Sequence, residues 1–155
     1  MNHLLSKLIS LLLTLGVAEC MASEFDTRIP ILEKGAVTYY VAGQVEGYGD
    51  TDFMVDTGSG YTAINEKMFE KLRHDSKVKF VSTVSGVLAN GERRKLSVYM
   101  IDRINVGGRC VIHDVKAIIL PGSTRNILGL SALKKTAPFA LSFDPPQLLL
   151  SNCIT

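Results

Sequence analysis

The sequence predicts one mostly β domain, with many short strands arranged as a barrel or sandwich and two short helices. Three observations support this fold class. The length of 155 residues fits one domain with a sizeable core. The composition, 46% hydrophobic and 21% charged, is typical of globular rather than disordered chains. Short apolar runs, many of them alternating with polar residues, are separated by turns rich in glycine, asparagine and proline, which is the pattern of β proteins.

The first 22 residues predict a signal peptide or an N-terminal anchor. The apolar run Leu8–Val17 is too short to span a bilayer comfortably, but it suits the hydrophobic part of a signal peptide. Cleavage after Ala22 would leave small residues at the expected positions. Lipidation at Cys20 and an uncleaved anchor both stay open, and either would tether the protein to a membrane. We therefore expect an exported protein, either periplasmic or anchored and facing the periplasm.

The rest of the chain divides into an N-terminal arm, residues 23–34, and a folded domain, residues 35–152. Strand-like runs in the domain follow a period of two residues or are continuously apolar. We expect strands at residues 37–41, 53–55, 78–87, 96–101, 104–106, 111–112, 115–120, 139–143 and 148–150. Turns are expected at residues 47–50, 90–91, 107–108, 121–122 and 145–146, because these positions carry glycine, asparagine or proline.

Two helices are predicted from their capping residues. Asn65 can cap a helix over residues 66–74, which has apolar residues on one face. Ser131 can cap a shorter helix that runs through Lys135 and that Pro138 prevents from extending.

Cysteine and histidine spacing gives no indication of a metal site. The chain contains no Cys-x-x-Cys motif, and His74 and His113 stand alone in the sequence. With Cys20 removed or lipidated, Cys110 and Cys153 remain, and they can form a disulfide in an oxidising compartment or stay as two buried thiols.

Charge does not indicate a nucleic-acid partner. The formal net charge is +2, and the sequence has no extended basic stripe. The short basic runs at residues 93–95 and 134–135 are interpreted as solvated surface.

The motif that can indicate a catalytic site is Asp56-Thr57-Gly58-Ser59, which follows the apolar strand Phe53–Val55. Gly58 has no Cβ, so the backbone can fold closely under the aspartate and donate N–H bonds to its carboxylate. Thr57 offers a hydroxyl beside the site, and Ser59 is expected to bond the outer carboxylate oxygen. An ordinary Asp-Gly turn at a strand end explains the same four residues without any catalytic role, and the motif alone does not decide between the two interpretations.

The wider succession of elements resembles the retropepsin-like family of aspartic proteases, especially its bacterial single-domain members. The resemblance covers roughly residues 35–150. It implies a closed barrel with a flap hairpin, half of a dimeric acid-protease fold. By matching motif, Asp56 is the catalytic residue, and Thr57, Gly58 and Ser59 form the active-site loop. The flap residues that would bind substrate are Val87, Leu88, Ala89, Asn90 and Gly91, and the support beneath the active-site loop is Ile127, Leu128 and Gly129.

The resemblance implies an aspartic endopeptidase that acts on peptide or protein substrates without a metal or organic cofactor. Because the chain has one Asp-Thr-Gly, the second catalytic aspartate is expected from Asp56 of another copy in a homodimer. Gly60-Tyr61 and Leu130-Ser131 occupy the places where many viral members carry an acidic pair and Arg-Asn, so the viral ion pairs at the dimer interface are not expected. The alternative is a cell-envelope module that keeps the fold and binds or regulates without cutting.

Overall fold

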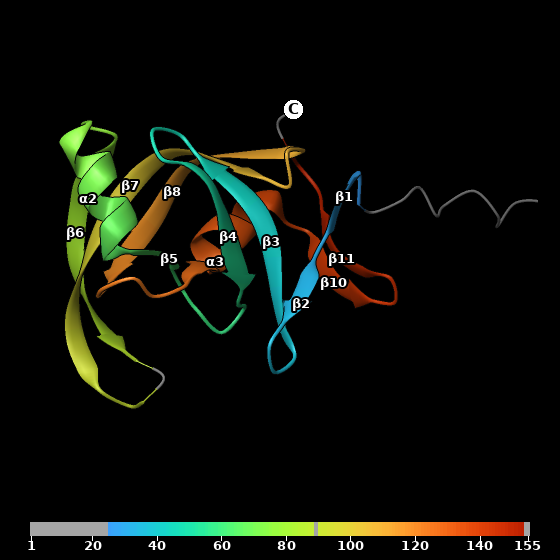
Figure 1. Ribbon diagram of the computed structural model, residues 1–155, viewed down its shortest axis with the longest axis horizontal. Helices are drawn as coiled ribbons and strands as arrows, with labels where there is room; N and C mark the ends of the chain where they lie inside the picture. Colours follow the sequence, from blue (N-terminus) through green and yellow to red (C-terminus); the bar gives the residue numbers. More distant parts are fainter. Residues whose placement is uncertain (1–24, 89, 154–155) are drawn as a thin grey trace, which may run out of the picture.

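The computed structural model describes residues 25–88 and 90–153 (Figure 1). The predicted leader, residues 1–22, and the flap residue Ala89 lie outside the described residues. Within the described ranges, none of the helices has the length and apolar character needed to cross a bilayer.

Eleven strands, two α-helices and one 3₁₀ turn follow one another along the described chain. The strands are β1 (Thr27–Pro30), β2 (Leu32–Lys34), β3 (Thr38–Val45), β4 (Gly49–Val55), β5 (Thr62–Asn65), β6 (Val78–Val87), β7 (Arg93–Val106), β8 (Cys110–Leu120), β9 (Asn126–Leu128), β10 (Phe139–Phe143) and β11 (Pro146–Leu150). The helices are α2 (Glu66–His74) and α3 (Leu130–Leu133), and the 3₁₀ turn η1 (Lys134–Thr136) follows α3. The chain is therefore mostly β with two short helices, as predicted.

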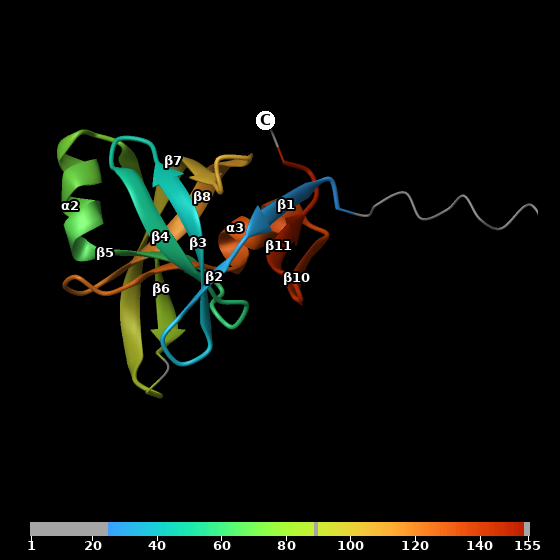
Figure 2. The ribbon, with the colours of Figure 1, turned by 45° about the vertical axis from the view of Figure 1, so that its right-hand side comes forward.

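Eight strands form one sheet in the order β2-β3-β4-β9-β5-β8-β7-β6. β3 also pairs with β7, with Gly43 opposite Val106 and Val45 opposite Ile104. This extra pairing joins β3, β4, β9, β5, β8 and β7 into a closed ring, which leaves β2 and β6 outside it. Figures 1 and 2 show the long β6–β7 hairpin extending from this ring, well away from β1.

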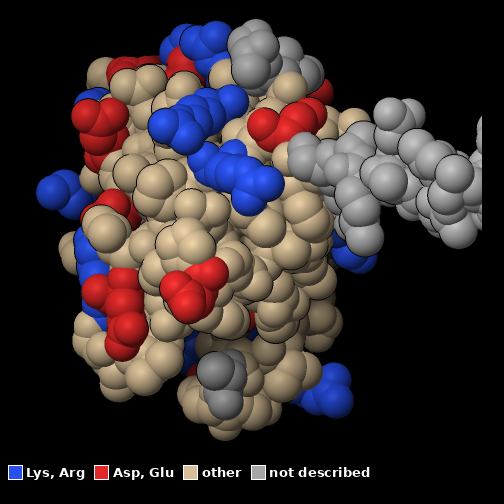
Figure 3. Space-filling view, turned by 90° about the vertical axis from the view of Figure 1, so that its right-hand side faces the viewer, with Lys and Arg blue, Asp and Glu red and all other residues tan. Residues whose placement is uncertain are grey.

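The second sheet has three strands in the order β1-β11-β10. Thr27 lies opposite Leu150 in the pairing of β1 with β11, so the first and last strands of the described chain are neighbours. Figure 3 shows the end of the molecule that carries this sheet, where basic and acidic side chains are interspersed around a broad uncharged area. The expected N-terminal arm includes β1 and β2, and its Ile29 and Ile31 are buried in the core.

The core lies inside the ring and continues beneath the smaller sheet. Alternation along β3 places Val41 and Val45 inside, where they are no more than 1% exposed. Gly43 lies between them in the strand, and a Cβ there would come within 2.8 Å of the Phe53 ring. Glycine at this position therefore lets a fully buried phenylalanine occupy the interior.

The helix predicted at residues 66–74 is confirmed, with Asn65 as its N-cap. The Asn65 side chain accepts a hydrogen bond from the Met68 N–H at 2.8 Å. The prediction for the second helix was wrong in its cap and in its bounds. α3 begins after Gly129 and is followed by η1. The Ser131 hydroxyl accepts from the Thr62 N–H at 2.7 Å and donates to the Lys116 carbonyl, so it joins separate strands and caps no helix.

Two expected interruptions of the sheet are absent from the structure. Residues 96–101 and 104–106 belong to the single strand β7, and residues 111–112 and 115–120 belong to β8. The ladder continues across the polar residues between these runs, where Arg103 lies opposite His113. Their side chains are exposed while the backbone stays paired, so polarity alone did not mark a turn. Gly49 and Asp50, expected in a turn, begin β4.

A disulfide joins Cys110 to Cys153, with their Cα atoms 4.8 Å apart. The bond connects the start of β8 to the segment that follows β11, and Cys110 is fully buried. The choice between a disulfide and two free thiols, which the sequence left open, is resolved in favour of the disulfide.

Candidate active site

Asp56 follows directly after β4, at the entrance to a turn that leads into β5. Its backbone N–H donates to the Leu128 carbonyl at 3.2 Å, which continues the parallel pairing of β4 with β9. Its carbonyl accepts from the Ser59 N–H at 3.3 Å and closes the turn. The Asp56 side chain is half-buried. A paired strand and a closed turn therefore hold this carboxylate at the surface of the barrel.

Gly58 lies under the carboxylate, as the sequence predicts. Its N–H donates to Asp56 Oδ1 at 2.8 Å. A Cβ at Gly58 would lie 3.1 Å from the same oxygen, which is tighter than ordinary van der Waals contact. Glycine therefore allows the close approach that orients the carboxylate. Thr57 is exposed beside it.

Ser59 has a different partner from the expected one. Its hydroxyl donates to the Tyr61 carbonyl at 2.6 Å and does not bond the Asp56 carboxylate. The reason is local: the chain turns again at Gly60, which brings the Tyr61 carbonyl over the Ser59 side chain. Ser59 thus stabilises the second half of the turn, while Gly58 contacts the carboxylate.

The segment Ile127–Gly129 packs against the Asp56 turn. The Leu130 N–H donates to the Ser59 carbonyl at 2.8 Å, immediately after Gly129. A Cβ at Gly129 would lie 2.2 Å from the Tyr61 carbonyl oxygen and 2.9 Å from that of Ser59. The two backbones are therefore in contact, and only glycine fits at position 129.

The hairpin of β6 and β7 ends in a three-residue loop rather than the expected two-residue turn. Leu88 donates to the Glu92 carbonyl at 2.9 Å, and the Gly91 N–H donates back to the Leu88 carbonyl at 2.8 Å. Gly91 has φ +84°, while Asn90 is not among the residues with positive φ. A glycine in this conformation at the end of a three-residue loop is a common hairpin closure. The Asn90 side chain accepts from the Glu92 N–H at 3.0 Å.

A cleft of about 1020 Å³ lies between the Asp56 turn and this hairpin. Its walls are mainly aliphatic, and Asp56 is the one carboxylate among the described residues that line it. The cleft residues from the turn, the hairpin and the barrel are Asp56, Gly58, Ser59, Gly60, Tyr61, Ala63, Val84, Ser85, Gly86, Val87, Leu88, Asn90, Leu96, Ile118, Leu120 and Ile127. An ionisable group at the edge of a long apolar cleft can act on an extended chain that fills the cleft.

The two flap residues Val87 and Leu88 differ in orientation. Strand alternation places the Leu88 side chain on the same face as Val84 and Gly86, and it is half-buried there. Val87 borders the cleft, but its side chain belongs to the opposite face and is 61% exposed. Among the described residues of the hairpin tip, Leu88 therefore supplies the apolar side chain that faces the cleft.

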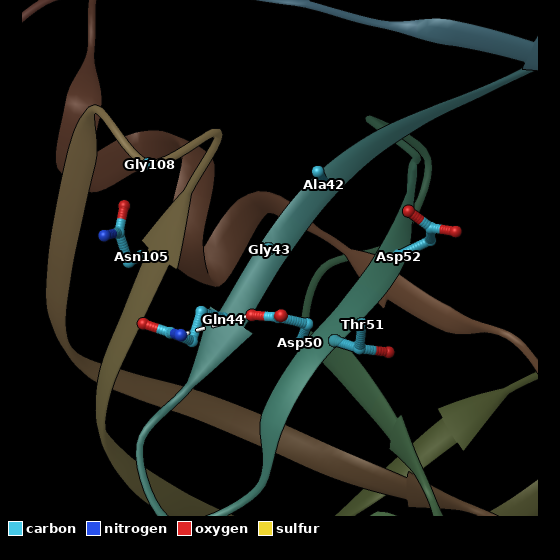
Figure 4. A pocket seen from close by; sticks show the side chains of 8 residues that line it. All are labelled: Ala42, Gly43, Gln44, Asp50, Thr51, Asp52, Asn105 and Gly108. Atoms are coloured by element: carbon cyan, nitrogen blue, oxygen red, sulfur yellow. Dashed lines mark hydrogen bonds between the residues drawn. The ribbon is translucent and has the colours of Figure 1, made fainter.

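Two other aspartates that precede Asp56 lie on a separate part of the surface. Asp50 and Asp52 are on β4 and line a hollow of about 530 Å³ between β3, β4 and the β7–β8 turn. Figure 4 shows Asp50 directed toward Gln44, whose amide donates to it at 3.1 Å. Asp52 points another way and pairs with Lys34. Neither lines the cleft that contains Asp56, so neither completes a carboxylate pair with it.

The described residues include no group of three or more histidines, cysteines or carboxylates close enough to bind a metal ion. The described site presents a fixed carboxylate that faces an apolar cleft, with a hairpin above it.

A closed β ring, a glycine turn that holds an aspartate, and a hairpin over the resulting cleft define the retropepsin-like class of aspartic proteases. The chain matches the family model of the gag-polyprotein putative aspartyl protease over residues 41–135. This match covers more than half of the sequence, and the chain belongs to this family. Membership of this family is consistent with a protease function.

A solved structure supports the same fold. The chain is similar to a retropepsin-like aspartic protease from Rickettsia conorii, with a TM-score of 0.61 and 24% sequence identity. The similarity covers 81% of this chain and 91% of the Rickettsia chain. No curated protein matches the sequence.

Proposed function

We propose that the protein is an aspartic endopeptidase and that Asp56 is its catalytic residue. The observation that carries this proposal is the position of Asp56, held by the Gly58 N–H and facing an apolar cleft beneath a hairpin. An extended peptide can lie in such a cleft as an added strand, with its alternate side chains in apolar pockets. Thr57, Gly58 and Ser59 serve as the loop that positions the carboxylate.

The reaction requires a second carboxylate close to Asp56. Two neighbouring carboxyl groups share one proton, because two negative charges so close together repel each other and both groups cannot be ionised at once. The ionised member takes a proton from a bound water, which attacks the scissile carbonyl carbon while the protonated member donates to the carbonyl oxygen. Collapse of the resulting diol breaks the C–N bond. The leaving nitrogen receives the proton that the first carboxylate took from water, and a diol hydroxyl returns its proton to the other carboxylate, which restores the shared proton.

Asp56 of a second copy is the proposed source of that carboxylate. Among the described residues no other carboxylate lines the cleft, and a two-fold axis near the turn would bring the two Asp56 side chains together. Exposed apolar side chains are available for such an interface: Leu32, Val37 and Phe143 are 62%, 72% and 58% exposed. Leu32 and Val37 belong to the β2–β3 hairpin. The turn of this hairpin lies beside the Asp56 turn in both ribbon views (Figures 1 and 2).

We also propose that the protein is exported, on the basis of the apolar run Leu8–Val17 in the sequence. A disulfide between Cys110 and Cys153 is compatible with an oxidising compartment. A reporter fused after Ser23 should be found outside the cytoplasm, and retention of the whole pool inside would contradict this proposal.

The substitution Asp56→Asn tests the proposed function. Because an amide cannot accept the proton of the water or cycle between acid and base, peptide cleavage should fall by at least about 10³-fold. Purified wild type and variant would be compared on one peptide library, with circular dichroism to show that both are folded and sedimentation to measure the dimer. A folded variant that cuts as fast as wild type would exclude the aspartic-protease mechanism. A folded wild-type dimer that cuts nothing would favour a binding module.

A further inference from the structure

The basic run at residues 93–95 is divided between the two faces of the flap hairpin. In the pairing of β6 with β7, Val84 lies opposite Leu96 and Gly86 lies opposite Arg94. Val84 and Leu96 line the cleft and are half-buried, whereas Ser85 and Val87, which also border the cleft, are exposed. Side chains of directly paired residues share a face, and the face alternates along each strand. Arg94 is therefore on the face of the hairpin that looks into the cleft, while Arg93 and Lys95 are on the outer face.

A second observation supports the placement of Arg94 on the cleft side of the hairpin. A Cβ placed on Gly86 would lie 2.6 Å from Leu96 Cδ1, so the Leu96 side chain, which lines the cleft, covers the same face of Gly86. Arg94 is the residue paired directly with Gly86 across the hairpin. Toward the hairpin loop, Leu88 also lines the cleft, and it is hydrogen-bonded to Glu92. Cleft-lining residues thus flank Arg94 along and across the hairpin.

The Arg94 guanidinium is only partly used within the protein. Its Nε donates to Glu92 Oε1 at 2.8 Å, and both side chains are about half exposed, at 50% and 46%. This hydrogen bond lowers the pKa of the Glu92 carboxyl and raises the pKa of Arg94. A guanidinium has five N–H donors. The four on its terminal nitrogens have no partner among the described residues.

We propose that Arg94 forms a polar subsite in the roof of the cleft and that the protein selects peptides with an Asp or Glu whose side chain points toward the flap. This inference rests on the proposed peptide-binding function and names a class of substrate for it. The terminal N–H groups of Arg94 can bind a carboxylate in a bidentate geometry. Residues 92–95 contain three basic residues and one acidic one, so the local field also attracts an acidic side chain. No Lys or Arg is among the described residues that line the cleft, and Arg94 lies in the hairpin next to lining residues, so it would reach a bound peptide from the edge of the roof.

The test measures binding rather than cutting, so that it does not depend on catalysis. Fluorescein-labelled octapeptides with Leu-Phe at the centre and alanine elsewhere would carry a single Glu or Gln at each remaining position in turn. Their binding to the full-length protein with Asp56→Asn would be followed by fluorescence anisotropy. At one or more positions the Glu peptide should bind about fivefold more tightly than its Gln counterpart, the size expected for a partly exposed ion pair.

Arg94→Gln in the same background should remove this difference, and Arg94→Glu should reverse it in favour of a Lys peptide. Arg93→Gln is the matched control, because it removes the same charge from the outer face and should leave the preference unchanged. The inference is overturned if no position prefers Glu, if Arg93→Gln removes the preference equally, or if the folded protein binds none of the peptides. Dissociation of the dimer by Arg94→Gln, measured by sedimentation, would also overturn it by placing Arg94 in the subunit interface. Selective binding of Glu peptides by a wild type that cuts nothing would retain the subsite and reject the proposed protease.

Discussion

Gly129 lies where the backbone of residues 127–129 contacts the backbone of the Asp56 turn. Gly129→Ala should therefore disturb that turn from beneath. The added Cβ would lie 2.2 Å from the Tyr61 carbonyl oxygen, about 1.2 Å short of ordinary contact at 3.4 Å. Backbone on both sides forms the contact, so no side chain can rotate to relieve it. We expect a loss of about 3 kcal/mol of folding free energy, at the upper end for overpacking, and a fall in melting temperature of about 10 °C.

The same displacement should also lower the activity of the folded protein. Tyr61 carries the carbonyl that accepts the Ser59 hydroxyl at 2.6 Å, and the Leu130 N–H binds the Ser59 carbonyl at 2.8 Å. A shift of about 1 Å in this turn would move the Asp56 carboxylate out of register with its partner in the proposed dimer. Misplacement of that size costs about 100-fold in rate.

The assay pairs a thermal melt with peptide hydrolysis at a temperature where the variant is folded. Gly60→Ala is the control, because Gly60 is in the same turn and a Cβ there would have nothing within 4 Å. The control should keep its melting temperature within about 2 °C of wild type. If Gly129→Ala is as stable and as active as Gly60→Ala, the contact between the two segments does not position Asp56.

Three further predictions concern other parts of the fold. Removal of the disulfide by Cys110→Ser with Cys153→Ser should cost about 4 kcal/mol, from the closure entropy of a loop with a sequence separation of 43, and an unchanged melting temperature would contradict the bond. Gly91→Val should lower peptide hydrolysis about tenfold. Its control is Gly108→Val, which is strained by a similar φ of +69° but lies outside the cleft and should lower only the melting temperature. If both variants lower hydrolysis equally, the flap loop is an ordinary surface loop. Asn65→Ala should cost about 1–2 kcal/mol by removing the cap of α2, and a melting temperature equal to wild type would show that the cap contributes nothing.

Features fixed by neighbouring residues could be predicted from the sequence. The cap at Asn65 depends on an N–H three residues away, and the Asp56 turn depends on Gly58 two residues away. The strand at residues 78–87 and the final hairpin follow from local alternation and from prolines. The resemblance to retropepsin-like proteases then added the long-range arrangement that these local patterns do not contain.

Features that depend on distant partners could not be predicted. Ser131 has the composition of a helix cap, but its partners are on strands 69 and 15 residues away in sequence. Whether Cys110 and Cys153 meet is a question of tertiary distance. The basic run at residues 93–95 was interpreted as solvated surface, yet its division between two faces depends on the register of β6 with β7, which shifts between Phe80 and Ser82.

The position of β1 determines from which direction any upstream segment can enter the domain. β1 forms one edge of the sheet at the opposite end of the molecule from the β6–β7 loop in both ribbon views (Figures 1 and 2). A lipid or uncleaved anchor attached ahead of this strand would therefore fix the protein by the end remote from the flap. The point of attachment would then leave the flap uncovered, so the anchored and released forms would accept the same peptides.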